Sequence, residues 1–182
     1  ITLIILPITV GAVVLRQPIV SVLFERGQFD ARATAMTASA LMFYSLGMVF
    51  YGYRDVLNRT FYSLQDTKTP MVNGALTVVL NIVLNLILVR FMQHNGLALA
   101  TSLAAVAMTV LLFTRLKKRL GHMGGRRLLY AFLKCGVASL IMGLVVYWLN
   151  GLAAGWGLSS SGLMGFLVLG AIIALGALVY FV

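Results

Sequence analysis

Asparagine and threonine side chains recur at regular intervals within one long apolar stretch of this sequence. Between residues 70 and 91 the polar positions follow one another every four residues, at Asn73, Thr77, Asn81 and Asn85. On a helix with 3.6 residues per turn, this spacing places them along one side. Two interpretations are open: the side chains hydrogen-bond a neighbouring helix, or their oxygens bind a small cation or a polar substrate.

The next apolar run adds a hydroxyl that can join this group. It carries small residues at helical spacing, namely Ala98, Thr101, Ala105 and Thr109, which allow a second helix to approach closely. A short turn at His94-Asn95-Gly96 separates the two runs and predicts an antiparallel helical hairpin. In such a hairpin Asn85 and Thr101 lie at similar depth. We therefore take Asn81, Asn85 and Thr101 as a candidate shared site.

An earlier apolar run ends in charged residues that suit an anionic ligand. Asp55 and Arg59 are four residues apart in the order that favours an ion pair on a helix. Arg54 has no acidic residue three or four positions away, so its charge must face water, another helix or an anion. Arginine binds phosphate well because its planar group donates two hydrogen bonds at once. Arg54, with Tyr51 and Asn58 nearby, is a candidate for a substrate path.

The first apolar run contains Arg16-Gln17-Pro18. Proline removes a backbone donor and biases the preceding residue away from the helical region, so this position predicts a kink or a break. A break there allows Arg16 either to extend toward the membrane surface or to line a cavity. Arg16 is therefore a further substrate-path candidate.

The residues needed for enzymatic chemistry are scarce. The chain has four acidic residues and one cysteine, and it contains no Ser/His/Asp set, no HExxH motif and no phosphate-binding glycine loop. His94 and His122 stand apart from other ligand types, so no metal site is expected beyond a sodium ion. These features disfavour an enzyme, and no cofactor is expected.

Apolar runs of about 20 residues dominate the chain, which is 61% hydrophobic and 10% charged over 182 residues. A helix of that length crosses a hydrocarbon core of ~30 Å. Continuous rather than alternating runs exclude strands, so the fold class is an all-α, polytopic transmembrane bundle. The predicted spans are 1–24, 34–62, 70–91, 96–116, 128–149 and 162–182. Because the chain begins and ends within apolar runs, we expect a fragment of a longer protein.

The net charge of +10 is distributed unevenly between the loops. Basic residues concentrate after the fourth span, at Arg115, Lys117, Lys118, Arg119, Arg126 and Arg127, and the loop after the second span carries Arg59 and Lys68. By the positive-inside rule these two loops are cytoplasmic, so the first span runs from inside to outside. The basic cluster is explained by topology and by anionic membrane lipids, and nucleic acid is not an expected partner.

A short polar segment, RTFYSLQDTKTP, joins the second and third spans. Asp66, Thr67 and Thr69 can cap the third span, with Pro70 in its first turn. Two roles are open for this segment: a hinge that bends during transport, or an ordinary helix–turn–helix joint. The candidate hinge residues are Arg59, Phe61, Tyr62, Asp66, Thr67, Thr69 and Pro70.

Two motifs together indicate a family. LRQPIVSVLFERGQFD, followed about thirty residues later by RTFYSLQDTKTP, resembles the MurJ (MviN) family of bacterial lipid II flippases, within the superfamily of multidrug, oligosaccharidyl-lipid and polysaccharide exporters. The resemblance implies fourteen helices in two lobes and a final pair. Residues 1–118 would be the last four helices of the second lobe. Residues 119–127 would be a basic cytoplasmic linker, and 128–182 a helix pair forming a groove for a lipid tail.

The same resemblance implies a function and a site. The expected function is to move lipid II, a lipid-linked peptidoglycan precursor, across the bacterial cytoplasmic membrane by alternating access, for cell wall synthesis. Cell wall synthesis and division proteins are candidate partners. Some family members bind sodium through an Asn, an acidic residue and a Thr that match Asn81, Asn85 and Thr101, but Asn85 replaces the carboxylate. The alternatives are a flippase or exporter for another lipid-linked oligosaccharide or a drug, and a non-transporting membrane scaffold.

Overall fold

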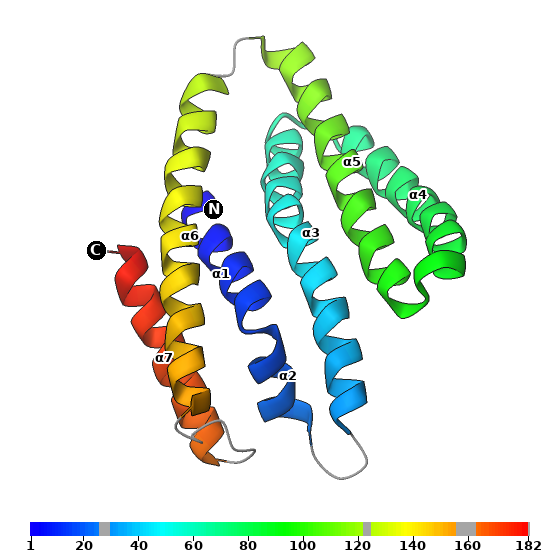
Figure 1. Cartoon of the computed structure of the whole chain (residues 1–182). Helices are drawn as coiled ribbons and strands as arrows, with labels where there is room; N and C mark the ends of the chain where they lie inside the picture. Colours follow the sequence, from blue (N-terminus) through cyan, green and yellow to red (C-terminus); the bar gives the residue numbers. More distant parts are fainter. Residues whose placement is uncertain (26–29, 122–124, 156–162, 182) are drawn as a thin grey trace. The chain divides into compact units, whose positions relative to one another are not determined.

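The computed structural model describes residues 1–25, 30–121, 125–155 and 163–181, and the regular structure within these ranges is helical throughout (Figure 1). The helices are α1 (Thr2–Val14), α2 (Arg16–Phe24), α3 (Ala31–Ser63), α4 (Lys68–Met92), α5 (His94–Leu120), α6 (Gly125–Gly155) and α7 (Leu163–Phe181). The helices α3 to α7 are each long and apolar enough to cross a membrane, and α1 with α2 makes a sixth span when the bent pair is counted as one crossing. The predicted all-α fold with six spans is confirmed.

The first crossing is broken where the sequence predicts it. The helices α1 and α2 meet at Leu15 with a bend of 73°. Pro18 is the third residue of α2 and has no N–H, so the Val14 carbonyl cannot accept the helical bond from position 18. On either side the helical pattern holds, because Leu15 N donates to Gly11 O and Ile19 N donates to Leu15 O, both at 2.8 Å.

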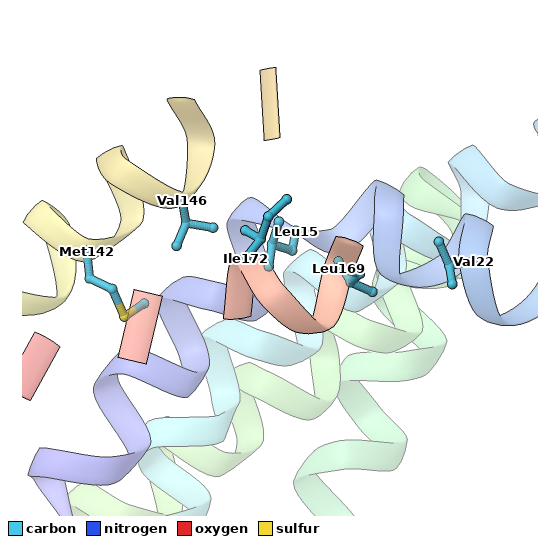
Figure 2. Packing of buried hydrophobic residues seen from close by; sticks show 6 residues of the cluster. All are labelled: Leu15, Val22, Met142, Val146, Leu169 and Ile172. Atoms are coloured by element: carbon cyan, nitrogen blue, oxygen red, sulfur yellow. The ribbon is translucent and has the colours of Figure 1, made fainter. Parts of the chain in front are cut away.

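Residues Thr2–Met42 and Ala131–Val182 form one compact unit, which contains α1, α2, α6, α7 and the start of α3. Its core is an apolar cluster drawn from three segments, shown in Figure 2: Leu15, Val22, Met142, Val146, Leu169 and Ile172. Two glycines allow the close packing around it. A Cβ on Gly143 would lie 2.6 Å from Val10 Cγ1, and one on Gly176 would lie 2.6 Å from Val146 Cγ2.

Residues Phe43–Tyr130 form the body of the other unit. Within it, the second half of α3 runs parallel to α5. Ser102 Oγ donates to Phe43 O, and Thr109 Oγ1 donates to Phe50 O at 3.0 Å, with the same separation of 59 residues in both pairs. An apolar cluster of Leu57, Phe61, Leu112 and Leu116 continues this parallel seam. Of the small residues predicted to pack, Ala98, Ala105 and Thr109 are buried and Thr101 is half-buried. Ala100 and Ala104, which were not predicted, are fully buried as well.

The α4–α5 hairpin is antiparallel as predicted, but its turn lies at the residue before the predicted one. Gln93 alone joins the two helices, with φ 48° and ψ −126°, and His94 already begins α5. Asn95 and Gly96 therefore belong to the first turn of the helix. Gly96 is needed for a close approach, because a Cβ there would lie only 2.4 Å from Leu88 O. The predicted turn at His94-Asn95-Gly96 is wrong for this reason.

Candidate functional site

A chain of side-chain hydrogen bonds links α4 to α5. The Asn85 amide nitrogen donates to Asn81 Oδ1 at 2.7 Å, and the Asn81 amide nitrogen donates to Thr101 Oγ1 at 3.3 Å. The Thr101 hydroxyl donates in turn to Leu97 O at 2.9 Å. The structure therefore brings together the three residues taken as a candidate ion site. All three side chains are half-buried.

The rest of the α4 stripe consists of Asn73, which is more enclosed, and Thr77, which is half-buried like the three site residues. The Thr77 hydroxyl donates to Asn73 O at 2.7 Å, so it returns to its own helix. Asn73 is 1% exposed. The Oδ1 atoms of Asn73 and Asn85 are buried and have no hydrogen-bond partner among the described residues. Buried amide oxygens without a partner are costly, so this helix face favours a polar neighbour, water or a ligand group.

The substrate-path candidates fall into two groups. In the unit with α4 and α5, the Arg54 guanidinium lies 5.1 Å from the centre of the Tyr51 ring, a cation–π contact. Asn58 Oδ1, one turn further along α3, is buried without a hydrogen-bond partner in the described part of the chain. Arg59 pairs with Asp55 at 3.0 Å as predicted, at the exposed surface. Arg16 belongs to the other unit, where its Nη1 donates to Met42 Sδ at 3.0 Å.

The segment between α3 and α4 is a closed joint. The Asp66 N–H donates to Phe61 O and the Gln65 N–H donates to Tyr62 O, both at 3.0 Å. Gln65 has φ 58°. This pattern is the Schellman motif, which satisfies the last carbonyls of a helix. Phe61 is 1% exposed and anchors the joint in the apolar cluster, whereas Tyr62 is exposed.

Asp66 also begins the next helix. Its Oδ1 accepts from Thr69 N at 3.0 Å and its Oδ2 accepts from the Thr69 hydroxyl at 2.8 Å. Pro70 lies in the first turn of α4, as predicted. The predicted cap by Thr67 is wrong, because Thr67 makes no side-chain capping bond; Asp66 already holds the amide it would reach. The last carbonyls of α3 and the first amides of α4 are hydrogen-bonded by residues of the segment itself. This geometry supports an ordinary helix–turn–helix joint rather than a bending hinge.

Arg119, in the last turn of α5, fastens this joint. Its Nη1 donates to Asp66 Oδ2. The Thr69 amide, the Thr69 hydroxyl and the Arg119 charge hold the pKa of the Asp66 carboxyl below its ordinary value of 3.8. A lowered pKa means that this stabilisation is complete above the ordinary value and is lost as the pH falls through the lowered one. The carboxylate is therefore fully engaged at neutral pH.

We expect Asp66→Ala to loosen the joint. The change removes the acceptor for the Thr69 amide and the partner of Arg119, so the Thr69 amide should exchange its hydrogen severalfold faster at neutral pH. Hydrogen–deuterium exchange of the peptide spanning the joint measures this. Asp55→Ala is the matched control, since it removes an exposed carboxylate that pairs only at the surface. Equal exchange rates in the two variants would contradict the assignment.

Two of the hollows in the unit that contains α6 and α7 matter for function, and the sequence predicted only one of these two, in part. The first is an apolar groove of about 340 Å³ along α1, α6 and α7. A groove at the final helix pair was expected, but α1 forms one wall of it. Gly176 lines this groove and also allows close packing against Val146. The second is a polar pocket of about 310 Å³ that includes Gln17, Glu25 and Asn150.

The basic segment after α5 is short. Gly121, with φ 73°, ends the helix, and α6 begins at Gly125. The expected linker 119–127 therefore includes the end of α5 and the first residues of α6. His122 lies outside the described residues.

Comparison with known families matches residues 1–167 to the family described as lipid II flippase MurJ. The chain belongs to this family. A probable lipid II flippase MurJ of Vibrio cholerae is 34% identical over 161 residues, which cover 87% of this chain and 31% of that protein. The lipid II flippase MurJ of Thermosipho africanus is 32% identical over 142 residues, covering 78% of this chain and 28% of that protein.

A solved structure agrees with the family. The structure of a lipid II flippase MurJ in an inward closed conformation matches 99% of this chain and 35% of that chain, with a TM-score of 0.80 and 28% identity. The chain thus spans about a third of the length of the relatives it matches. The resemblance inferred from the two sequence motifs is confirmed. Family membership and the apolar helices make this a multi-pass protein of the bacterial cytoplasmic membrane.

Proposed function

We propose that the protein moves lipid II, the lipid-linked peptidoglycan precursor, from the inner to the outer leaflet, and that it acts by transport and not by catalysis. The observation that carries this proposal is the match of residues 1–167 to the flippase family. A headgroup with phosphates and sugars cannot cross hydrocarbon unaided, because each unsatisfied polar group there costs several kcal/mol. Alternating access past a polar cavity removes that cost.

The described residues can serve this cycle in two places. The polar face of α4 and the Arg54 guanidinium supply hydrogen-bonding groups for the headgroup on helices that are otherwise largely apolar. The apolar groove along α1, α6 and α7 is long and lined by residues such as Ile4, Ile8 and Ile173, which suits a lipid tail. Movement of an anion outward is also favoured by the inside-negative potential, by ~2.3 kcal/mol per charge per 100 mV. The cycle can therefore proceed without a nucleotide.

We infer that this part of the protein does not rely on sodium. Asn81, Asn85 and Thr101 provide only neutral oxygens, and Asn81 Oδ1 already accepts from the Asn85 amide. That amide N–H takes up one lone pair of Asn81 Oδ1 and presents the positive end of a dipole to it. A sodium ion prefers a site with a carboxylate, so these three residues do not fit it well. These hydrogen bonds instead support a packing role, because the bond from Asn81 to Thr101 joins α4 to α5.

The test of the proposed substrate uses the whole protein in cells depleted of their own flippase. Expression should restore access to lipid II on the outer face, measured by labelling or cleavage of the exposed precursor. Stable expression at the membrane without any accessible precursor would reject the substrate.

Arg54→Ala should slow this flipping on the order of tenfold, because one charge-assisted hydrogen bond to a phosphate is lost. Arg32→Ala is the matched control, since Arg32 is exposed at the start of α3. The rate of precursor exposure in depleted cells measures both. Equal rates for the two variants would remove Arg54 from the transport path.

A further inference from the structure

The polar pocket has a position and a lining that the proposed function does not use. It is formed where α2 ends, where α3 begins, and by the facing parts of α6 and α7. Its polar lining residues are Gln17, Ser21, Glu25, Thr34 and Asn150. A volume of about 310 Å³ is at the lower end of the range for small-ligand sites.

One negative charge dominates this pocket. Glu25 is the only ionisable side chain among the described lining residues. The buried Thr34 hydroxyl donates to Glu25 Oε2 at 3.3 Å, which holds the carboxylate toward the start of α3. The other polar lining groups are amides and hydroxyls, which are neutral. Such a lining favours a cation with several N–H donors and disfavours a headgroup that carries only negative charge.

The pocket and the apolar groove follow one seam. Along α7, Val168, Leu169 and Ile172 line the pocket, whereas Ile173, Gly176, Ala177 and Tyr180 line the groove. On the opposite wall, α2 lines most of the pocket and α1 lines most of the groove. The core cluster shown in Figure 2 lies along the same seam. The seam thus has polar side chains among the apolar ones at one end and is apolar along the remainder, which matches the chemistry of an amphiphile.

The charge distribution places the polar end at the outer surface. The basic residues of the chain concentrate in the loops after α3 and α5, which makes those loops cytoplasmic. The end of α2 and the start of α3 then face outside. The pocket therefore lies at the level of the outer headgroups, and the groove leads from it toward the membrane interior.

We propose that this seam binds an outer-leaflet phospholipid with an amino headgroup. Its ammonium group binds Glu25, the amides of Gln17 and Asn150 hydrogen-bond the rest of the headgroup, and one acyl chain follows the apolar groove. The acyl chain of this phospholipid occupies the groove while no precursor tail is bound there. This alternation with the precursor tail rests on the proposed function, whereas binding of the phospholipid to the seam does not.

Lipid retention by the purified whole protein tests this proposal without any measurement of flipping. Native mass spectrometry after delipidation would compare phosphatidylethanolamine and phosphatidylglycerol with the same acyl chains. The unaltered protein should retain phosphatidylethanolamine on the order of tenfold better, the effect of one charge-assisted hydrogen bond. Glu25→Gln should remove this preference and leave phosphatidylglycerol retention unchanged.

Three further variants separate the headgroup from the chain. Ala35→Phe fills the pocket from an exposed position and should lower phosphatidylethanolamine retention with a normal unfolding temperature. Ala177→Phe fills the groove and should lower retention of both lipids alike. Asp55→Asn removes an exposed carboxylate in the other unit and should change neither. Equal retention of the two lipids by the unaltered protein, or full phosphatidylethanolamine retention by Glu25→Gln, would overturn the proposal.

Discussion

Replacing Gly96 by alanine should destabilise the α4–α5 hairpin more than any other single methyl group added to α4 or α5. The new Cβ would lie 2.4 Å from Leu88 O and 2.6 Å from Leu88 C, where ordinary contact begins at 3.4 Å. Because the obstacle is backbone, the helices must separate by about 1 Å at their closed end. Overpacking of this kind costs roughly 3 kcal/mol. The 3.3 Å bond from Asn81 to Thr101 should also break.

Thermal unfolding of the purified whole protein measures this effect as a midpoint lowered by several degrees. Gly74→Ala is the matched control in the same helical pair. A Cβ on Gly74 meets nothing within 4 Å, and alanine favours a helix over glycine by about 1 kcal/mol. Gly74→Ala should therefore keep or raise the midpoint. If both variants unfold at the same temperature, the close approach at Gly96 is wrong.

The double variant Asn81→Leu with Asn85→Leu should lose flipping by tenfold or more while the protein remains folded. Interhelical hydrogen bonds within membranes contribute only about 0.6 kcal/mol each, so two leucines cost little stability. They do remove the polar groups that α4 presents beside Thr101. The rate of precursor exposure should therefore fall, whereas the midpoint of thermal unfolding should change little.

Ile82→Leu with Leu86→Ile provides the control, since both residues are exposed apolar neighbours on the same helix. This pair should transport normally. A non-transporting scaffold would support cell wall growth equally with either pair. Normal flipping by the asparagine double variant would exclude the α4 polar face from the transport path.

Features set by near neighbours in the chain could be predicted from the sequence. The break before Pro18 follows from a missing N–H, the Asp55–Arg59 pair from helical spacing, and the Asp66 cap from its place before α4. Each depends on residues no more than four positions apart. The grouping of Asn81, Asn85 and Thr101 also followed from the predicted hairpin, although Asn81 makes the bond to Thr101, whereas Asn85 was expected at its depth.

Features that depend on tertiary packing could not be predicted. Gly96 is a residue type that is common in turns, but here glycine is required because the backbone of Leu88 lies too close for a Cβ. The residue with the unusual positive φ is Gln93. The polar pocket combines Glu25, the residue after α2, with Asn150 from α6, and no sequence spacing links these positions.

The interruption at Leu15 has a consequence for how the protein is made. At 1.5 Å per residue, the 13 residues of α1 reach about 20 Å and the 9 residues of α2 about 14 Å, so neither rod alone traverses the hydrocarbon. The partners that cover Leu15 include Met142 on α6 and Ile172 on α7, and both are synthesised later than α1 and α2. The crossing formed by α1 and α2 therefore reaches its final arrangement only after α6 and α7 have entered the bilayer.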